Sequence, residues 1–317
     1  MSDEPTSTNA DHPATSPGSG RWIVGIDGSE CGRHAALWAV AHASGRASEL
    51  RLATSWSLPV ASTMTPMSPL TTAASFDGLE ESAFATVDEL AAQIEPSFDG
   101  VVTRCVGRGS AASLLLDSAR DSDLLVVGSR GRGGFARLLL GSTSAQCATH
   151  SPGPVAVIPA TAGIGPITSI LVAFDGSDHS IAALSWAIGF ASCGTVIECA
   201  SVWDTSPIAV GSDRFFFPEA TDLARQRSEH LVAATVDAND RDDVDVRAVF
   251  VEGHPRTVLA ERAADSDLVV MGARGHGAIG AAVLGSVSTW LLHHVDGAMV
   301  VVRSSTADVA ESDLVER

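Results

Sequence analysis

The sequence repeats itself once, and this internal repeat limits the possible folds more than any other feature. The segment WIVGIDGSE (22–30) returns as ILVAFDGSD (170–178), and DSDLLVVGSRGRGG (121–134) returns as DSDLVVMGARGHGA (265–278). The offset between the copies is 148 residues at the first pair and 144 at the second. Two copies at so steady an offset predict two domains of one topology, and the 317 residues are enough for both.

The repeat and the composition between its copies give the domain boundaries. We place the first domain at residues 21–159 and the second at 170–303, joined by a linker of glycine, small and polar residues at 160–169. Residues 1–20 lack the basic start and apolar core of a signal peptide, so we expect a disordered N-terminal tail. Residues 304–317 are expected to form a polar C-terminal tail. No apolar run reaches the roughly 18 residues of a membrane span, so we expect a cytoplasmic protein.

Each copy alternates short apolar runs with helical patterns. Apolar runs that are continuous indicate strands buried on both faces, and helices between such strands indicate a parallel sheet. The predicted fold class is therefore α/β: two tandem Rossmann-like domains, each a five-stranded parallel-type sheet with helices on both faces, related by a pseudo-twofold axis. In the first copy we expect strands at 22–26, 50–56, 101–106, 124–127 and 154–158, helices at 30–45, 79–94, 110–120 and 142–150, and a long loop at 57–78; a second long loop is expected at 204–218.

Charge excludes several classes of function. The formal net charge of −18 argues against binding to nucleic acid or to an anionic membrane. All twenty basic residues are arginines, so chemistry that needs a lysine, such as a Schiff base or the phosphate-binding P-loop, is excluded. A site for a phosphorylated ligand must then be a local patch in an acidic protein.

A glycine-rich turn follows the fourth apolar run in both copies. Gly128 and Gly131 are separated by two residues, and nine further residues lead to Gly141 and Ser142; the same spacing recurs at Gly272, Gly275, Gly285 and Ser286. Glycines let consecutive backbone N–H groups face an anion, and the start of the next helix adds more. Identical spacing in two copies favours a phosphate site over two ordinary turns.

With these motifs the sequence resembles the universal stress protein family, specifically its ATP-binding class. That class carries the same glycine spacing after its fourth strand and an aspartate at the end of its first. The resemblance covers residues 21–159 and 168–303 and implies a nucleotide-dependent regulatory protein of stress or growth control, with ATP as ligand, up to two per chain. Members pair as dimers through the last strand. Here the linker leads us to expect that residues 155–158 and 298–302 pair within one chain as a pseudo-dimer, while a further homodimer and a regulatory protein partner stay open.

The resemblance also implies site residues, carried over by position. Asp27 and Asp175 lie at the ribose and are candidates to hold Mg²⁺ on bound ATP. In the second copy, Ala173 replaces the glycine at position 25 and Val287 lacks the hydroxyl of Thr143, which favours weaker phosphate binding there. The first site consists of Gly25, Asp27, Gly28, Ser55, Val127, Gly128, Ser129, Arg130, Gly131, Arg132, Gly133, Gly134, Gly141, Ser142 and Thr143; the second consists of Asp175, Gly176, Val202, Met271, Gly272, Ala273, Arg274, Gly275, His276, Gly277, Gly285, Ser286 and Val287.

Two enzymatic alternatives compete with this interpretation. The segment GHGAIG (275–280) fits a dinucleotide-binding fingerprint, but that fingerprint belongs after the first strand, with an acidic residue about 20 positions on. A slow ATPase or phosphate-transfer enzyme on the same fold stays open. No candidate general base recurs in both copies, so we assign no catalytic residue.

Overall fold

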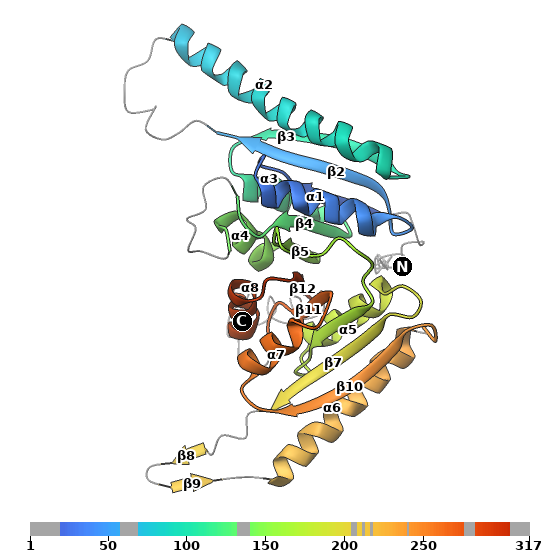
Figure 1. The fold of residues 1–317 in the computed structure, drawn as a ribbon. Helices are drawn as coiled ribbons and strands as arrows, with labels where there is room; N and C mark the ends of the chain where they lie inside the picture. Colours follow the sequence, from blue (N-terminus) through green and yellow to red (C-terminus); the bar gives the residue numbers. More distant parts are fainter. Residues whose placement is uncertain are drawn as a thin grey trace, which may run out of the picture.

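Ten strands from the two halves form one continuous sheet in the computed structural model (Figure 1). The structure describes residues 20–57, 69–131, 140–203, 208–210, 213–215, 218–239, 241–275 and 283–304. The strand order is β10-β7-β6-β11-β12-β5-β4-β1-β2-β3, and neighbours are parallel except where β5 meets β12. This confirms the α/β class and joins the two predicted five-stranded sheets into one.

The first half contains, in chain order, β1 (Gly20–Gly25), α1 (Glu30–Ala43), β2 (Ala47–Trp56), α2 (Pro69–Ile94), β3 (Val101–Arg108), α3 (Ala111–Ser118), β4 (Leu124–Gly128), α4 (Ser142–His150) and β5 (Val155–Ile158). The second half contains β6 (Ser169–Ala173), α5 (Asp178–Phe190), β7 (Val196–Trp203), the hairpin β8 (Ile208–Val210) and β9 (Asp213–Phe215), α6 (Pro218–Asn239), β10 (Asp245–Glu252), α7 (Pro255–Ala263), β11 (Leu268–Gly272), α8 (Ser286–His294) and β12 (Ala298–Val302). No described helix is both long and apolar enough to cross a membrane.

The predictions of two long loops were partly wrong. Helix α2 begins at Pro69 rather than at residue 79, and the hairpin of β8 and β9 lies within the expected loop 204–218. The apolar stripe that marks α2 starts only where the helix packs on the sheet, because the stripe reflects burial. The earlier turns extend past the sheet (Figure 1), so no stripe marks them. A proline at the first helical position is the signal that could have shown the true start.

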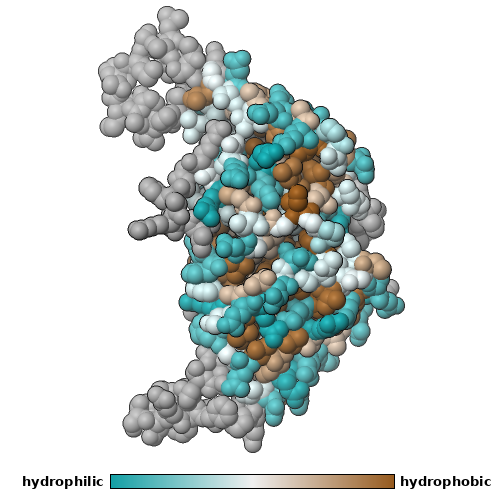
Figure 2. Space-filling model, viewed as in Figure 1, coloured by the Kyte–Doolittle hydropathy of each residue, from teal (hydrophilic) through white to brown (hydrophobic). Residues whose placement is uncertain are grey.

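Both faces of the sheet are covered by helices. One apolar cluster holds side chains of α1, α2, α5 and α6, and a second holds those of α3, α4, α7 and α8. All five residues of β4 and of β11 are buried, as their continuous apolar sequences predict. On the face shown in Figure 2, apolar patches are interspersed among hydrophilic residues, as on most folded proteins.

The pairing of β5 with β12 confirms the predicted intrachain pseudo-dimer. The two strands are antiparallel, with Met299 opposite Val157, Val300 opposite Ala156 and Val301 opposite Val155. Every residue of both strands is buried. An apolar strand that would lie at the edge of an isolated half is therefore in the centre of the full sheet, which removes an exposed edge.

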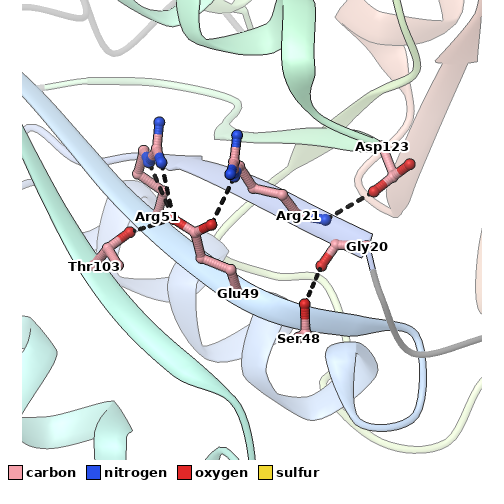
Figure 3. A network of polar contacts seen from close by, with 7 residues as sticks. All are labelled: Gly20, Arg21, Ser48, Glu49, Arg51, Thr103 and Asp123. Carbon is pink, nitrogen blue, oxygen red and sulfur yellow. Dashed lines mark hydrogen bonds and ion pairs between the residues drawn. The ribbon is translucent and has the colours of Figure 1, made fainter.

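A polar network links the amino ends of three strands in the first half (Figure 3). Glu49 on β2 accepts hydrogen bonds from Arg21 at 2.6 Å, Arg51 at 3.0 Å and Thr103 at 2.7 Å, and so links β1, β2 and β3. Burial alone would raise the pKa of Glu49, but these hydrogen bonds outweigh it and hold the pKa below its usual value. Asp123 accepts the backbone N–H of Arg21 at 2.7 Å. The network stabilises the sheet at the edge opposite the carboxyl ends of the strands.

An aromatic cluster joins α1 to α5 across the two halves. The rings of Trp38 and Phe190 lie 6.4 Å apart at an interplanar angle of 4°. Arg46 lies 4.6 Å from the centroid of the Phe190 ring and donates to the Phe190 carbonyl at 2.8 Å. His42 contacts Trp38 with ring centroids 4.6 Å apart, and by the repeat it occupies the position of Phe190 in the first copy. The contact between α1 and α5 is therefore aromatic, with one charged and one titratable member.

His42 should make the fold sensitive to acid. Burial, followed by the positive charge of Arg46, lowers the pKa of His42 to about 4 from 6.5, while Asp267 acts in the opposite direction. Because the pKa is depressed in the folded state, the neutral imidazole stabilises the fold above pH 6.5, and this stabilisation is lost as the pH falls toward 4. We expect a lower melting temperature at pH 5 than at pH 7, measured by circular dichroism, and His42→Phe should reduce the difference. The exposed His230 is the control, and an equal pH dependence in His42→Phe would contradict the assignment.

Candidate functional site

Asp27 and the glycine-rich turn meet at the carboxyl ends of β1 and β4. One carboxylate oxygen of Asp27, Oδ1, accepts the backbone N–H of Ser29 at 2.9 Å, and the Ser29 hydroxyl accepts the N–H of Gly32 at 3.1 Å as the cap of α1. The same hydroxyl donates to the carbonyl of Arg130 at 3.4 Å, from a residue 101 positions away. Ser29 was not among the predicted site residues. A serine repeated at the same place in both copies was the signal that could have found it.

Two glycines of the turn approach other backbone and side-chain groups closely. A Cβ on Gly131 would overlap the carboxylate of Asp27, and a Cβ on Gly128 would lie 2.7 Å from the carbonyl carbon of Cys31. Gly28 has a φ of 73°, which a residue with a side chain rarely adopts. The absence of side chains at these positions therefore lets the turn, the end of β4 and the start of α1 come together.

The glycine-rich turn ends at Gly141, where α4 begins. The N–H of Gly141 donates to the Ser129 carbonyl at 2.7 Å, and the Ser144 hydroxyl donates to the Gly128 carbonyl at 2.6 Å, so the turn is held at both ends. Gly141 caps α4 without a side-chain hydrogen bond, so the N–H groups of the first turn have no partner within the helix. The buried Nε of Arg130 also has no partner among the described residues. This end of the site offers several donors to one anion.

The other predicted residues of the first site lie around this turn. Gly25 ends β1, Ser55 is half-buried near the end of β2, and Val127 is buried in β4. Ser142 and Thr143 form the first turn of α4. Three predicted residues, Arg132, Gly133 and Gly134, lie outside the described part of the chain.

The second half repeats the arrangement. Asp175 accepts the N–H of Ser177 at 3.0 Å and its hydroxyl at 2.6 Å, and that hydroxyl lies 3.3 Å from the Arg274 carbonyl. The N–H of Gly285 donates to Ala273 at 2.8 Å, and Ser288 donates to Gly272 at 2.8 Å. Gly176 has a φ of 80°, as its counterpart in the first half predicts. The predicted residues His276 and Gly277 lie outside the described part of the chain.

Arginine is used differently in the two halves. Arg274 is 5% exposed, and its Nε donates to the Val283 carbonyl at 3.0 Å. The Nε of Arg130, in contrast, has no partner among the described residues. The two arginines at matching positions therefore differ in the hydrogen bonding of Nε, and weaker phosphate binding at the second site stays a prediction.

A cavity of about 810 Å³ lies at the second site. Its size is in the range of small-molecule and cofactor sites. Trp203, Phe250 and several residues of α6 also line it, and none of them was among the predicted site residues. Trp203 recurs in the first copy as Trp56, which was the signal that could have found it. Ala273 is at the turn but is not part of the wall. The predicted residues on the wall are Asp175, Gly176, Val202, Met271, Gly272, Arg274, Gly275, Gly285, Ser286 and Val287.

Among the described residues, no group of three His, Cys, Asp or Glu side chains lies close enough together to hold a metal ion. Asp27 and Asp175 are single carboxylates, each already accepting a hydrogen bond from a serine N–H. A hard cation at either aspartate therefore needs oxygen ligands from another molecule, such as phosphate groups.

Comparison with known proteins gives a consistent result. A family model described as the universal stress protein family matches residues 20–159 and 166–303. Universal stress protein Rv1996 of Mycobacterium tuberculosis is 29% identical over 309 residues, which cover 89% of this chain and 94% of that protein. A universal stress protein of Mycolicibacterium smegmatis is 31% identical over 202 residues, or 62% of this chain and 67% of that protein.

Solved structures agree on the fold. A universal stress protein from Archaeoglobus fulgidus has a TM-score of 0.63 and 20% identity, and covers 90% of this chain and 98% of its own. Two shorter universal stress proteins are described with bound nucleotides, one in complex with cAMP and one from Arabidopsis thaliana with AMP; each covers 44% of this chain, with TM-scores of 0.32 and 0.31.

Proposed function

Since this chain belongs to the universal stress protein family, we propose that it is a regulatory protein that binds ATP at two sites, one in each half, and that nucleotide occupancy sets its regulatory state. The observation that carries the proposal is the repeated contact between the aspartate loop and the glycine-rich turn. In both halves a serine bonded to the aspartate also reaches the carbonyl of the turn arginine. This contact, present in both halves, holds the aspartate loop against the glycine-rich turn, whose backbone N–H groups can face a phosphate.

The phosphate groups fit the start of α4 in the first half and of α8 in the second. Neither helix has a side-chain cap, so the first-turn N–H groups and the hydroxyls of Ser142 and Ser286 can donate to phosphate oxygens. The turn glycines allow a ligand to approach the backbone, and Arg130 adds a charge-assisted donor in the first half. In a chain of net charge −18, donors concentrated at this edge supply the local attraction that a phosphate needs.

The nucleoside fits the ends of the neighbouring strands. Asp27 and Asp175 can accept a ribose hydroxyl, or hold Mg²⁺ together with the phosphates. In the second half, Val202 and Met271 form apolar walls of the cavity, where a purine ring would be removed from water. Under this proposal, each part of ATP has residues to contact it. No candidate general base recurs at both proposed sites, so the proposal favours a bound nucleotide over rapid turnover.

Calorimetry on nucleotide-free protein tests this proposal. We expect binding of ATP at up to two sites per chain, with the first site tighter. Asp27→Ala should weaken binding at the first site by roughly tenfold or more, because a hydrogen bond to a charged group contributes about 1.5–3 kcal/mol. The matched control is Asp117→Ala, an exposed aspartate of α3, which should leave both affinities unchanged.

Several outcomes would count against the proposal. Purified protein whose heat-released supernatant lacks adenine absorbance, together with no heat of ATP binding, would exclude nucleotide binding. Equal affinity in Asp27→Ala and wild type would leave Asp27 as a structural residue that orders the Ser29 turn. Rapid, Mg²⁺-dependent release of ADP would favour the alternative, an ATPase or phosphate-transfer enzyme.

A further inference from the structure

The cavity of the second half extends past the predicted site to the opposite face of the sheet. Ala200 and Val202 of β7 lie on the face that packs against α7 and α8. Side chains alternate along a strand, so Ser201 and Trp203 lie on the other face. There the Ser201 hydroxyl is 2.5 Å from the hydroxyl of Ser228 on α6. We call this part of the cavity the α6 lobe; it consists of Ser201, Trp203, Arg227, Ser228, Leu231 and Phe250.

The chemistry of the α6 lobe differs from that of a nucleotide site. Trp203 and Phe250 supply flat aromatic surfaces, and Leu231 adds an aliphatic one that adjoins the main apolar core. The two serine hydroxyls are bonded to each other, so they offer little to a polar ligand. Arg227 is an exposed cation on the wall that has no hydrogen bond or ion pair with any described residue. The lobe thus combines a planar apolar surface with one positive charge.

The first half does not build this lobe. The buried Val87 of α2 corresponds to Val232 of α6, which places Ser82 and Thr86 where the second half has Arg227 and Leu231. The tryptophan is kept, as Trp56, but its ring is covered by Arg108 at 5.7 Å.

The strand register explains the difference. Trp56 pairs with Arg108 across β2 and β3, whereas Trp203 pairs with Glu252 across β7 and β10. In the second half the residue beside the tryptophan is therefore an acid, and Trp203 itself lines the cavity. Among the described residues, the α6 lobe belongs to the second copy alone. The fold that both copies share therefore does not require it.

We propose that the α6 lobe is a second ligand site, which binds a planar aromatic carboxylate. Trp203 and Phe250 contact the ring, and Arg227 pairs with the carboxylate. The residues assigned to the nucleotide lie on the loops and on the face of α7 and α8, so the lobe is a distinct part of the same cavity. A cationic ligand is disfavoured by Arg227, and a sugar or free phosphate would find few open hydrogen-bonding groups on the walls.

The probe is 2-naphthoate, with 2-naphthalenemethanol as a neutral molecule of similar shape, titrated by calorimetry into the nucleotide-free full chain. We expect one naphthoate per chain. Arg227→Gln should weaken naphthoate about fivefold, as an exposed ion pair allows, and leave the alcohol unchanged. Leu231→Trp should fill the lobe and block both probes. Arg225→Gln is the control, because Arg225 is on the same helix but pairs with Glu229 at 2.9 Å.

AMP separates this proposal from that of nucleotide binding. If the lobe is a separate site, saturating AMP leaves naphthoate binding in place, and Arg227→Gln leaves AMP binding unchanged. Stoichiometric displacement of naphthoate by AMP, no binding at millimolar probe, or equal naphthoate affinity in Arg227→Gln and wild type would overturn it. Failure of the wild type and of every variant to bind either AMP or ATP would contradict the proposed function alone.

Discussion

Replacing Val300 by aspartate should strongly destabilise the whole chain. Val300 is 0% exposed, lies in the middle of β12 and is opposite Ala156 of β5. A carboxylate there would be buried without a partner at the junction of the two halves. We expect a loss of more than about 4 kcal/mol in the free energy of unfolding, which is a large part of the roughly 5–15 kcal/mol of a typical domain. Urea unfolding followed by circular dichroism measures this loss.

The control is the same substitution on an edge strand. Val101 begins β3 and is 61% exposed, so Val101→Asp should change the stability by no more than about 0.5 kcal/mol. If the halves were independent, Val300→Asp would leave a cooperative unfolding transition of the first half at its original midpoint. That result would show that the pairing of β5 and β12 does not couple the stability of the two halves.

Gly128→Ala should damage both the fold and the first site. The new Cβ would lie 2.7 Å from the carbonyl carbon and 2.8 Å from the carbonyl oxygen of Cys31. These are backbone atoms in the first turn of α1, which cannot rotate away as a side chain can. Overpacking of this kind costs about 1–3 kcal/mol, and the end of β4 should shift away from α1. We expect a melting temperature several degrees lower and weaker nucleotide binding at the first site, measured by calorimetry.

Two further alanine variants complete this test. Gly272→Ala meets the backbone of His179 at 2.9 Å in the same way, so it should weaken the second site instead. Gly189→Ala is the control: it lies in α5 with no atom within 4 Å of the new Cβ, and alanine is the better helix former by about 0.5–1 kcal/mol. Unchanged affinity at the first site in Gly128→Ala would show that the close approach does not shape that site.

Much of the architecture could be predicted because its causes are local or repeated. The continuous apolar runs at β4 and β11 indicate strands buried on both faces, and both are buried at every residue. The start of α2 at Pro69 could not be predicted from a stripe, because that stripe exists only where the helix contacts the sheet. The spacing of the glycines likewise predicts a turn after each of these strands. It says nothing of Ser29, whose hydroxyl reaches the Arg130 carbonyl across 101 residues of chain.

What the sequence by itself determined is the repeat, the α/β class, and the spacing that brings an aspartate loop and a glycine-rich turn to one edge of each half. These follow from periodicity and backbone freedom, which act over a few residues and so are written in the chain. Only the tertiary structure decided that Arg274 is committed to the Val283 carbonyl while the Nε of Arg130 has no described partner, and that Trp203 lines a cavity while Trp56 is covered by Arg108. The reason is physical: each difference depends on which side chains from distant elements occupy the same space, and two copies with one backbone can fill that space differently.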